Sequence, residues 1–470
     1  MLNFWYIDKD PNSGHVRNNY FPRTELSKLY LNGITLESKR WHGHLIFEPG
    51  VLHKSTDRIT FKQVWQQEPV VSDNNVFVLQ IDNINDEIFH TDFLHPLNIL
   101  PQEVVEWLRR YPFVNIVFFE AKEFNDVGSY RFITIPSIEV YKKKLDIINR
   151  VIYLNCGSNN EVFNDGGRPH PYWFTILGCP FYPQLAYSTH FKYRGRGRLE
   201  ELGSVDFLNK VYPEEKFVDK FEPSHKFLMV SGRARHGRIL LASDVLDNIP
   251  EKDILYRVNR PGHKPNEPFL TYDVIPGMTD QQTKRYNHIC NTTPLGNIDL
   301  EYNNYEEENW FLHPDPQLYK KIFLEIVNET FSDGSLTKSE LNHCYDGTKI
   351  FITEKVMKPI VTYRPFIVNA NSGFLTHLQK LGFKTFGDFW DESYDSTYDF
   401  DMKSKKIVSI LKELNKLSEQ ELKKMYSNMV PILKHNRQVA EKFLFSESVW
   451  VTKLIDFYNK HKKPNYSTFI

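Results

Sequence analysis

Two segments in the second half of the chain place charged residues where helices are expected to begin. The first, Ser231–Arg238 (SGRARHGR), follows an apolar, strand-like run and precedes a stretch with apolar residues at helical spacing. A helix N-terminus at the carboxyl end of a strand presents free N–H groups and a partial positive charge to an anion. The guanidinium groups of Arg233, Arg235 and Arg238 have a geometry that suits a pair of phosphates. The segment therefore predicts an anion site, with a solvated basic loop as the alternative.

The second segment contains Thr353, Glu354 and Lys355 at the start of another predicted helix. Thr353 can cap this helix, which places Glu354 and Lys355 in its first turn. A carboxylate there can accept hydrogen bonds from two ribose hydroxyls, while a neighbouring ammonium group reaches a diphosphate. Lys358 joins these candidate binding residues, and Pro359 predicts a kink in the helix. The alternative role for Glu354 is to complement the helix dipole.

The elements that must position these residues alternate between strand-like and helix-like stretches. Apolar runs separated by amphipathic stretches indicate a parallel sheet covered on both faces. A loop-like region, Ser158–Glu215, interrupts this alternation of predicted strands and helices, which then resumes. The predicted strands are 76–82, 113–120, 151–157, 226–232, 253–259, 323–330 and 365–370. The predicted helices are 100–111, 137–150, 236–248, 353–363 and 373–382, with several more between 403 and 463.

This pattern predicts an α/β protein of two successive doubly wound, Rossmann-like units with a helical C-terminal tail. We expect an N-terminal unit over 1–220, a C-terminal unit over 221–445 and a terminal helix over 446–470. The cleft between two such units is the default position for a binding site.

Composition excludes several classes of protein. The chain has 470 residues, 41% of them apolar and 25% charged, which is ordinary for a globular protein. Lysine and arginine number 58 against 59 for aspartate and glutamate, so any site for a polyanion must be local. The four cysteines are too widely spaced for a zinc knuckle or a redox motif. The sequence shows neither a signal peptide nor an apolar run of membrane-spanning length, so we expect a cytoplasmic protein without a membrane span.

The two charged segments also carry a family resemblance. The patterns K-F-L-x-x-x-G-R-x-R-H-x-R and F-I-T-E-K-x-x-K-P-I-x-x-x-x-P-F-I-V, followed by LQKLGFKTFGDFWDESYD, resemble glycosyltransferases of bacteriophages and large viruses. The T-E-K tripeptide is similar, more distantly, to the donor motif of fucosyltransferases, although the preceding HCYDGTKIFI departs from that motif and argues against fucose. The resemblance covers Lys226–Asp395. It implies a GT-B fold, a nucleoside diphosphate sugar as donor, no tightly bound cofactor and no bound metal.

The resemblance also implies roles for individual residues. Glu354 would hold the donor ribose, Lys355 the diphosphate, and the arginines of the first segment the phosphates of the leaving group. Glu329, which ends the predicted strand before the T-E-K segment, would face the same crevice. The terminal helix would brace the N-terminal unit, as in relatives with this fold. The low alanine content is typical of an AT-rich genome, which agrees with a viral source and, in that case, the host cytoplasm.

A glycosyl transfer also needs a base that deprotonates the acceptor hydroxyl, or a nucleophile if the reaction proceeds through a covalent intermediate. Asp82 and Glu120 each end a predicted strand of the N-terminal, acceptor-binding unit, and we favour Glu120. Each is also explained as an ordinary polar residue at a strand end.

A third basic segment, FKYRGRGR, suggests what the acceptor is. Its basic residues are Lys192, Arg194, Arg196 and Arg198. Flexible glycines let such guanidinium groups follow a polyanion, and Tyr193 could stack on a base. We therefore expect the acceptor to be either a glycan or a hydroxymethylated base of phage DNA. The alternative interpretation of the segment is a solvated linker loop without a binding role. The alternative function is a non-enzymatic nucleotide or nucleic-acid binding protein.

Overall fold

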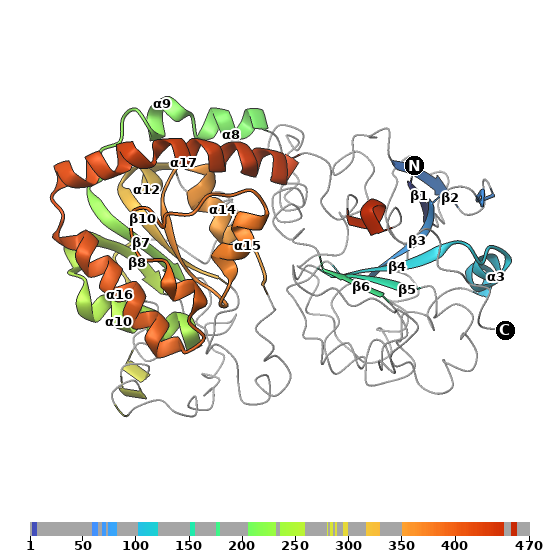
Figure 1. Ribbon diagram of the computed structural model, residues 1–470, viewed down its shortest axis with the longest axis horizontal. Helices are drawn as coiled ribbons and strands as arrows, with labels where there is room; N and C mark the ends of the chain where they lie inside the picture. Colours follow the sequence, from blue (N-terminus) through green and yellow to red (C-terminus); the bar gives the residue numbers. More distant parts are fainter. Residues whose placement is uncertain are drawn as a thin grey trace. The chain divides into compact units, whose positions relative to one another are not determined.

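The chain divides into two compact units, each described by itself (Figure 1). The first comprises Met1–Tyr193 with Phe445–Ile470, and the second comprises Arg194–Leu444. The computed structural model describes residues 2–6, 59–63, 68–71, 74–81, 102–120, 151–155, 175–178, 205–231, 236–258, 316–329, 350–445 and 453–457, with short pieces between 280 and 298. Within these residues, no helix combines the length and the apolar character needed to cross a membrane.

The first unit is built on a parallel sheet whose described strands run in the order β2-β1-β3-β4-β5-β6. The strands are β1 (Leu2–Tyr6), β2 (Ile59–Gln63), β3 (Asn74–Ile81), β4 (Asn115–Glu120), β5 (Val151–Asn155) and β6 (Thr175–Gly178). Every neighbouring pair is parallel, and the order reverses between β1 and β3, so the sheet is doubly wound. Helix α3 (Gln102–Arg110) buries Trp107 against Trp5 of β1, with ring centroids 5.4 Å apart.

The second unit has a five-stranded sheet in the order β11-β10-β7-β8-β9. The strands are β7 (His225–Ser231), β8 (Ile254–Val258), β9 (Leu295–Gly296), β10 (Ile322–Asn328) and β11 (Phe366–Asn369). All pairs are parallel except β8 with β9. Every residue of β10 and β11 is buried, as expected for strands covered on both faces. The order reverses between β7 and β10, which makes this sheet doubly wound as well.

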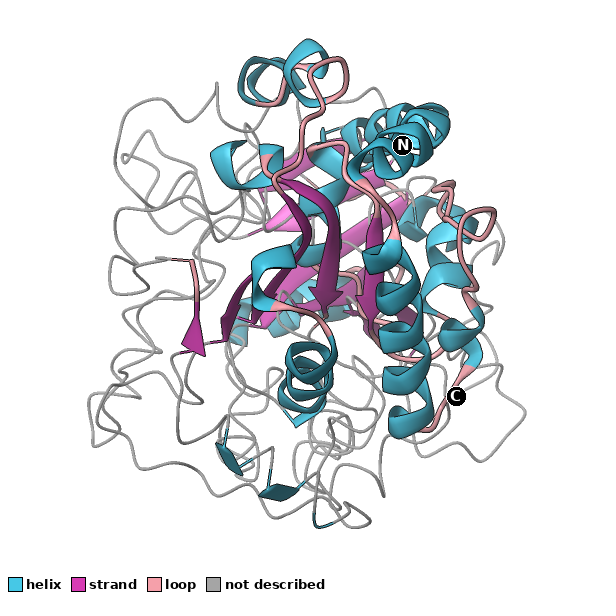
Figure 2. Ribbon diagram, turned by 90° about the vertical axis from the view of Figure 1, so that its left-hand side faces the viewer, coloured by secondary structure: helices cyan, strands magenta, loops and turns pink. Residues whose placement is uncertain are grey.

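Helices cover both faces of the second sheet (Figure 2). On one face α10 (His236–Asn248) packs against α16 (Phe400–Lys416). On the other face α14 (Glu354–Val361) contacts β10 and β11, and α17 (Glu419–Phe445) runs along the same side (Figure 1). The step from β7 to β8 and the step from β10 to β11 run in opposite directions across the sheet. Because both connections are right-handed, their helices lie on opposite faces.

The remaining helices of the second unit are short. They are α8 (Val205–Val211), α9 (Glu214–Phe217), α12 (Pro316–Lys320) and α15 (Phe374–Lys380), with the 3-10 turns η2 (Glu251–Asp253) and η4 (Ser393–Ser396).

The predicted α/β class with parallel, doubly wound sheets is confirmed in both units. The predicted strands of the second unit agree with β7, β8, β10 and β11 to within two residues, and the predicted helix 236–248 is α10. The predicted helix 137–150 lies outside the described residues. Strands β1 and β2 were not predicted.

The prediction that 158–215 is a loop is wrong for β6, α8 and the start of α9. The two helices are fixed by α17, more than two hundred residues further along the chain. Arg437 donates from Nη2 to Oδ1 of Asn209 in α8 at 3.1 Å, and Lys434 pairs with Glu214 of α9 at 2.5 Å. Local composition could not reveal contacts with so distant a helix. Both helices belong to the second unit, although they precede the expected boundary at 220.

Candidate functional site

The candidate site lies at the carboxyl edge of the second sheet, where the strand order reverses between β7 and β10. Doubly wound sheets bind ligands outside the carboxyl ends of their strands at such a switch point. Three buried polar side chains end neighbouring strands there: Ser231 in β7, Asn328 in β10 and Asn369 in β11. Asn369 Nδ2 donates to Asn328 Oδ1 at 3.0 Å, and Asn328 Nδ2 donates to Ser231 Oγ at 3.2 Å. We call these three residues the polar row.

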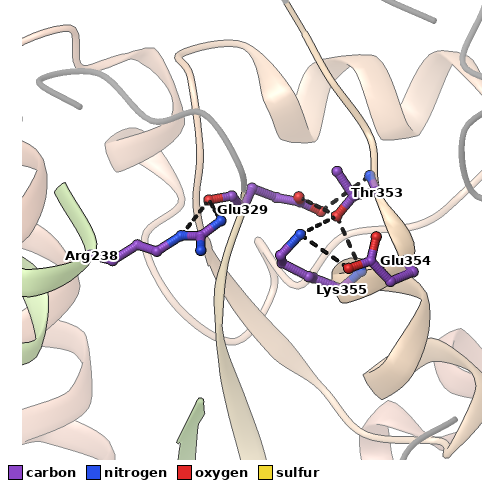
Figure 3. A network of polar contacts seen from close by, with 5 residues as sticks. All are labelled: Arg238, Glu329, Thr353, Glu354 and Lys355. Carbon is purple, nitrogen blue, oxygen red and sulfur yellow. Dashed lines mark hydrogen bonds and ion pairs between the residues drawn. The ribbon is translucent and has the colours of Figure 1, made fainter. Parts of the chain in front are cut away.

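Arg238 crosses the switch point from the first turn of α10. Its Nε and Nη2 atoms donate to the backbone carbonyl oxygen of Glu329, just after β10, at 3.0 and 2.8 Å (Figure 3). The side chain is buried, so this contact holds a positive charge inside the protein at the carboxyl edge. Charged donors make stronger hydrogen bonds than neutral ones, which gives the contact a fixed geometry.

Thr353 caps α14, as the sequence predicted, and connects this helix to Glu329. Its Oγ1 atom accepts a hydrogen bond from the Lys355 backbone N–H at 3.2 Å. The same hydroxyl donates to Glu329 Oε2 at 2.5 Å and accepts from Lys355 Nζ at 3.2 Å. Lys355 Nζ also pairs with Glu354 Oε1 at 3.1 Å (Figure 3). The residues drawn in Figure 3 form what we call the carboxyl-edge network: Arg238, Glu329, Thr353, Glu354 and Lys355.

Solvent exposure separates the members of this network. The Lys355 side chain is 21% exposed, whereas the Glu354 side chain is 2% exposed. Arg238, Glu329 and Thr353 are also buried. The Lys355 side chain is therefore the part of the network that solvent reaches most easily, and a ligand would reach it in the same way.

Two further ionisable groups lie behind the network. Burial raises the pKa of the Glu325 carboxyl in β10 to about 7, although the Tyr319 hydroxyl donates to its Oε2 atom at 2.6 Å. Burial lowers the pKa of the Lys358 ammonium in α14, against the attraction of Glu354 and Glu325. Burial thus pushes both groups toward their neutral forms, because a low dielectric disfavours an isolated charge.

The helices that begin at this edge differ in what their N-termini meet. The Asp395 carboxylate accepts from the backbone N–H groups of Leu375 and Thr376 in α15, at 2.9 and 3.3 Å. Thr353 caps α14, whose first turn carries Glu354. Helix α10, in contrast, has no acidic residue in its first turn. The helix dipole of α10 therefore favours an anion without opposition from an acidic residue in its own first turn.

The structure brings together six of the predicted binding residues at one edge of one sheet. These are Arg238, Glu329, Thr353, Glu354, Lys355 and Lys358. The other predicted residues Arg233, Arg235, Asp82, Lys192, Arg194, Arg196 and Arg198 lie outside the described residues. Glu120 is the last residue of β4 in the first unit, where its backbone is paired with Ile81 of β3.

Sequence reasoning missed the polar row and the Tyr319–Glu325 contact. A signal for the polar row is nevertheless present, because the same tripeptide, Ile-Val-Asn, ends both β10 and β11. The two copies are in register, with Asn328 opposite Asn369. Asparagine is disfavoured in strands, so its recurrence at two strand ends indicates a role at the sheet edge.

The chain was compared with known proteins. No protein-family model matches it, and no curated protein sequence matches it. Among solved structures, it is similar to an α,α-trehalose 6-phosphate synthase from Burkholderia multivorans, with 12% identity, a TM-score of 0.34 and coverage of 82% of this chain and 70% of that one. A UDP-forming α,α-trehalose-phosphate synthase from Burkholderia vietnamiensis gives 13% identity, a TM-score of 0.32 and coverage of 76% and 70%. Likenesses this weak carry no argument about function, and the fold assignment rests on the two parallel sheets themselves.

Proposed function

We propose that the protein is a glycosyltransferase that moves a sugar from a nucleoside diphosphate sugar to a hydroxyl acceptor, with its two α/β units in the GT-B arrangement. The observation that carries the proposal is the carboxyl-edge network. It gathers cationic and carboxylate side chains from α10, β10 and α14 at the switch point of one sheet. A protein that only binds DNA or RNA needs surface cations, not carboxylates buried among them.

The donor would bind along this edge with its diphosphate between α10 and Lys355. Glu354, whose Oε1 pairs with Lys355, would accept the ribose hydroxyls through its other carboxylate oxygen. As the bond between sugar and phosphate breaks, negative charge grows on the leaving diphosphate, and cations fixed beforehand stabilise it. Lys355, together with Arg238 on the other side of Glu329, would supply this charge, and so we propose a reaction that needs no divalent metal ion.

The base that activates the acceptor would come from the first unit. The switch point of its sheet lies between β1 and β3, and Asp82 follows the last residue of β3 in the sequence. Glu120 ends β4, one strand further from the switch point. Strand order therefore favours Asp82 over Glu120, which reverses the preference drawn from the sequence. Replacing the base by its amide should slow transfer and leave donor affinity unchanged, so kinetics of Asp82→Asn and Glu120→Gln will identify it.

The proposal also covers the acceptor and the source of the protein, and both of these parts rest on the sequence. The resemblance of Lys226–Asp395 to transferases of phages and large viruses supports a hydroxymethylated DNA base or a glycan as the acceptor, in the host cytoplasm. The basic segment that would contact DNA, around Arg194 and Arg196, lies outside the described residues. The departure from the fucosyltransferase motif before Thr353 supports a sugar other than fucose.

A thermal-shift screen tests the donor site. The purified protein is heated with UDP, GDP, ADP, CMP and TDP and their common sugar conjugates, with and without EDTA. We expect one nucleoside diphosphate family to raise the melting temperature in both conditions, because ligands that bind the native state stabilise it. Cleavage of the matching sugar conjugate then separates an enzyme from a nucleotide-binding protein. A shift with oligonucleotides and none with nucleotides would overturn the proposal in favour of a nucleic-acid binding protein.

A further inference from the structure

We propose that Glu329 and Thr353 are positioning residues that hold the Lys355 ammonium in place for the donor diphosphate. This inference rests on the proposed function, because it assigns a purpose to contacts inside the same site. Neither residue would touch the donor, because the Glu329 carboxylate and the Thr353 hydroxyl are engaged with each other and with Lys355.

Glu329 is held on both sides of its peptide backbone. Its N–H donates to the carbonyl oxygen of Asn369 at 3.0 Å, and its own carbonyl accepts the two hydrogen bonds from Arg238. The carboxylate therefore extends from a fixed point beside the polar row. It accepts from Thr353 twice, from the backbone N–H at 3.4 Å and from the hydroxyl at 2.5 Å. Glu329 thus connects the start of α10 to the start of α14.

The Thr353 hydroxyl transmits this position to Lys355. A hydroxyl has one hydrogen to donate and two lone pairs that accept. The hydrogen points to Glu329, so both lone pairs face Lys355, one toward its backbone N–H and one toward Nζ. Without the carboxylate, the hydroxyl could rotate and its lone pairs would no longer be aligned with the ammonium group.

Helix capping alone does not explain the arrangement. An N-cap needs only an acceptor for a backbone N–H of the first turn, which the hydroxyl provides to Lys355 without help. A buried carboxylate is costly, and Glu329 lies 24 residues earlier in the sequence than the hydroxyl it contacts. The Glu329 contact also orients the hydroxyl, because the hydrogen that it receives leaves the lone pairs directed at Lys355. Since Lys355 is also the most exposed member of the network, this orientation acts on the group that a ligand meets.

Calorimetric titrations of the full chain test the inference with the nucleoside diphosphate found in the screen and with the corresponding nucleoside, which lacks phosphate. Thr353→Val removes the hydroxyl at constant shape, and Thr353→Ser is the matched control that keeps it. We expect Thr353→Val to bind the diphosphate about tenfold or more weakly, the usual loss for a hydrogen bond involving a charged group, while its affinity for the nucleoside stays within about twofold. Thr353→Ser should stay within about threefold of the parent for both ligands. Glu329→Gln should reproduce the Thr353→Val result and serves as the second variant if the first fails to fold.

A double-mutant cycle with Lys355→Met separates positioning from capping. If Thr353 acts through Lys355, Thr353→Val will weaken diphosphate binding by less than about twofold further once the ammonium is absent. Lys424→Met, at an exposed position of α17, controls for the loss of a lysine. Full additivity in the cycle, or equal losses for diphosphate and nucleoside, would overturn the inference and leave the donor site standing. A parent protein that binds no nucleoside diphosphate would overturn the donor site and the inference together.

Discussion

The two edges of the second sheet both bury an arginine, but they use it differently. At the amino edge, Arg364 precedes β11 and donates to the backbone carbonyls of Tyr319 and Phe217 at 2.7 and 2.9 Å. It also donates to the Tyr426 hydroxyl at 2.8 Å, and its guanidinium faces the ring of Phe221 at 5.0 Å. We call this group of five residues the Arg364 hub. At the carboxyl edge, Arg238 donates to the backbone carbonyl of Glu329, and the carboxylate of Glu329 belongs to the ionisable network.

The difference shows how a buried charge can serve stability or binding. Among the described residues, the partners of Arg364 are backbone carbonyls, a phenol and aromatic rings, and none of them is a carboxylate with which a ligand could exchange. The carboxyl-edge network holds two carboxylates, Glu329 and Glu354, and reaches solvent through Lys355. Groups that can exchange partners are suited to ligands, whereas groups whose partners are fixed are suited to holding elements together. The comparison therefore predicts opposite effects of substitution at the two edges.

The largest expected effect is on stability, at the amino edge. Arg364→Met should lower the free energy of unfolding by about 3 kcal/mol or more, because it leaves several buried acceptors without a donor. Nucleotide affinity of the folded variant should be unchanged. Urea denaturation measures the first quantity and calorimetry the second. A loss below about 1 kcal/mol would show that the hub does not stabilise the unit as the comparison requires.

The next effect is on binding, at the carboxyl edge. Glu354→Ala should weaken nucleoside diphosphate binding by about 1.5 to 3 kcal/mol, the range for hydrogen bonds to a charged group, with a smaller loss of stability than Arg364→Met. The matched control is Glu413→Ala in α16, which removes a carboxylate from a pair with Lys416 in which both side chains are exposed. Titration calorimetry of both variants makes the comparison. Unchanged affinity in a folded Glu354→Ala protein would remove Glu354 from the site.

His377 is a buried residue outside both the Arg364 hub and the carboxyl-edge network, and replacing it should raise stability instead of lowering it. Both ring nitrogens of His377 in α15 are buried without a hydrogen-bond partner, and burial lowers its pKa to about 4. His377→Leu should raise the free energy of unfolding at pH 7 by about 2 kcal/mol, because it removes two unmatched polar atoms. His377 should cost the parent stability as the pH falls from 6.5 through 4, because the unfolded chain binds a proton that the folded one resists. Urea denaturation of both proteins from pH 4 to 7 should therefore show a stability difference that grows as the pH falls, and a difference independent of pH would argue against this role.

The smallest expected effect concerns Glu325, which lies on β10 between the two edges. Its pKa is raised by burial, so the folded protein holds this proton more tightly than the unfolded chain. That contribution is fully present below the ordinary pKa of 4.5 and is lost as the pH rises through about 7. Glu325→Gln should remove this dependence, because the amide has no proton to lose in this pH range. The difference between parent and variant from pH 5 to 8 isolates it, since His377 is common to both, and a constant difference would contradict the assignment.

Much of the second sheet could be predicted because its signals are local. Strands such as β7 and β10 consist mostly of apolar residues, with Phe227–Val230 in β7 and Glu325 as the one charged residue of β10, and such runs predict buried strands. Helices α8 and α9 were missed because Pro and Gly in the preceding segment indicate loops, while the contacts that fix them come from α17. Prediction failed where the deciding contacts are long-range.

The same division runs through the candidate site. The sequence by itself determined that Thr353 caps α14 and that Glu354 and Lys355 fall in its first turn, since a cap depends on residues within one turn. It also determined the α/β class, through the alternation of apolar runs and amphipathic stretches. Only the tertiary structure decided that Arg238 meets the backbone of Glu329, 91 residues away, and that the Glu329 carboxylate meets Thr353. Such meetings depend on the order of strands in the sheet, which arises from the packing of the whole unit and is not written in any local pattern.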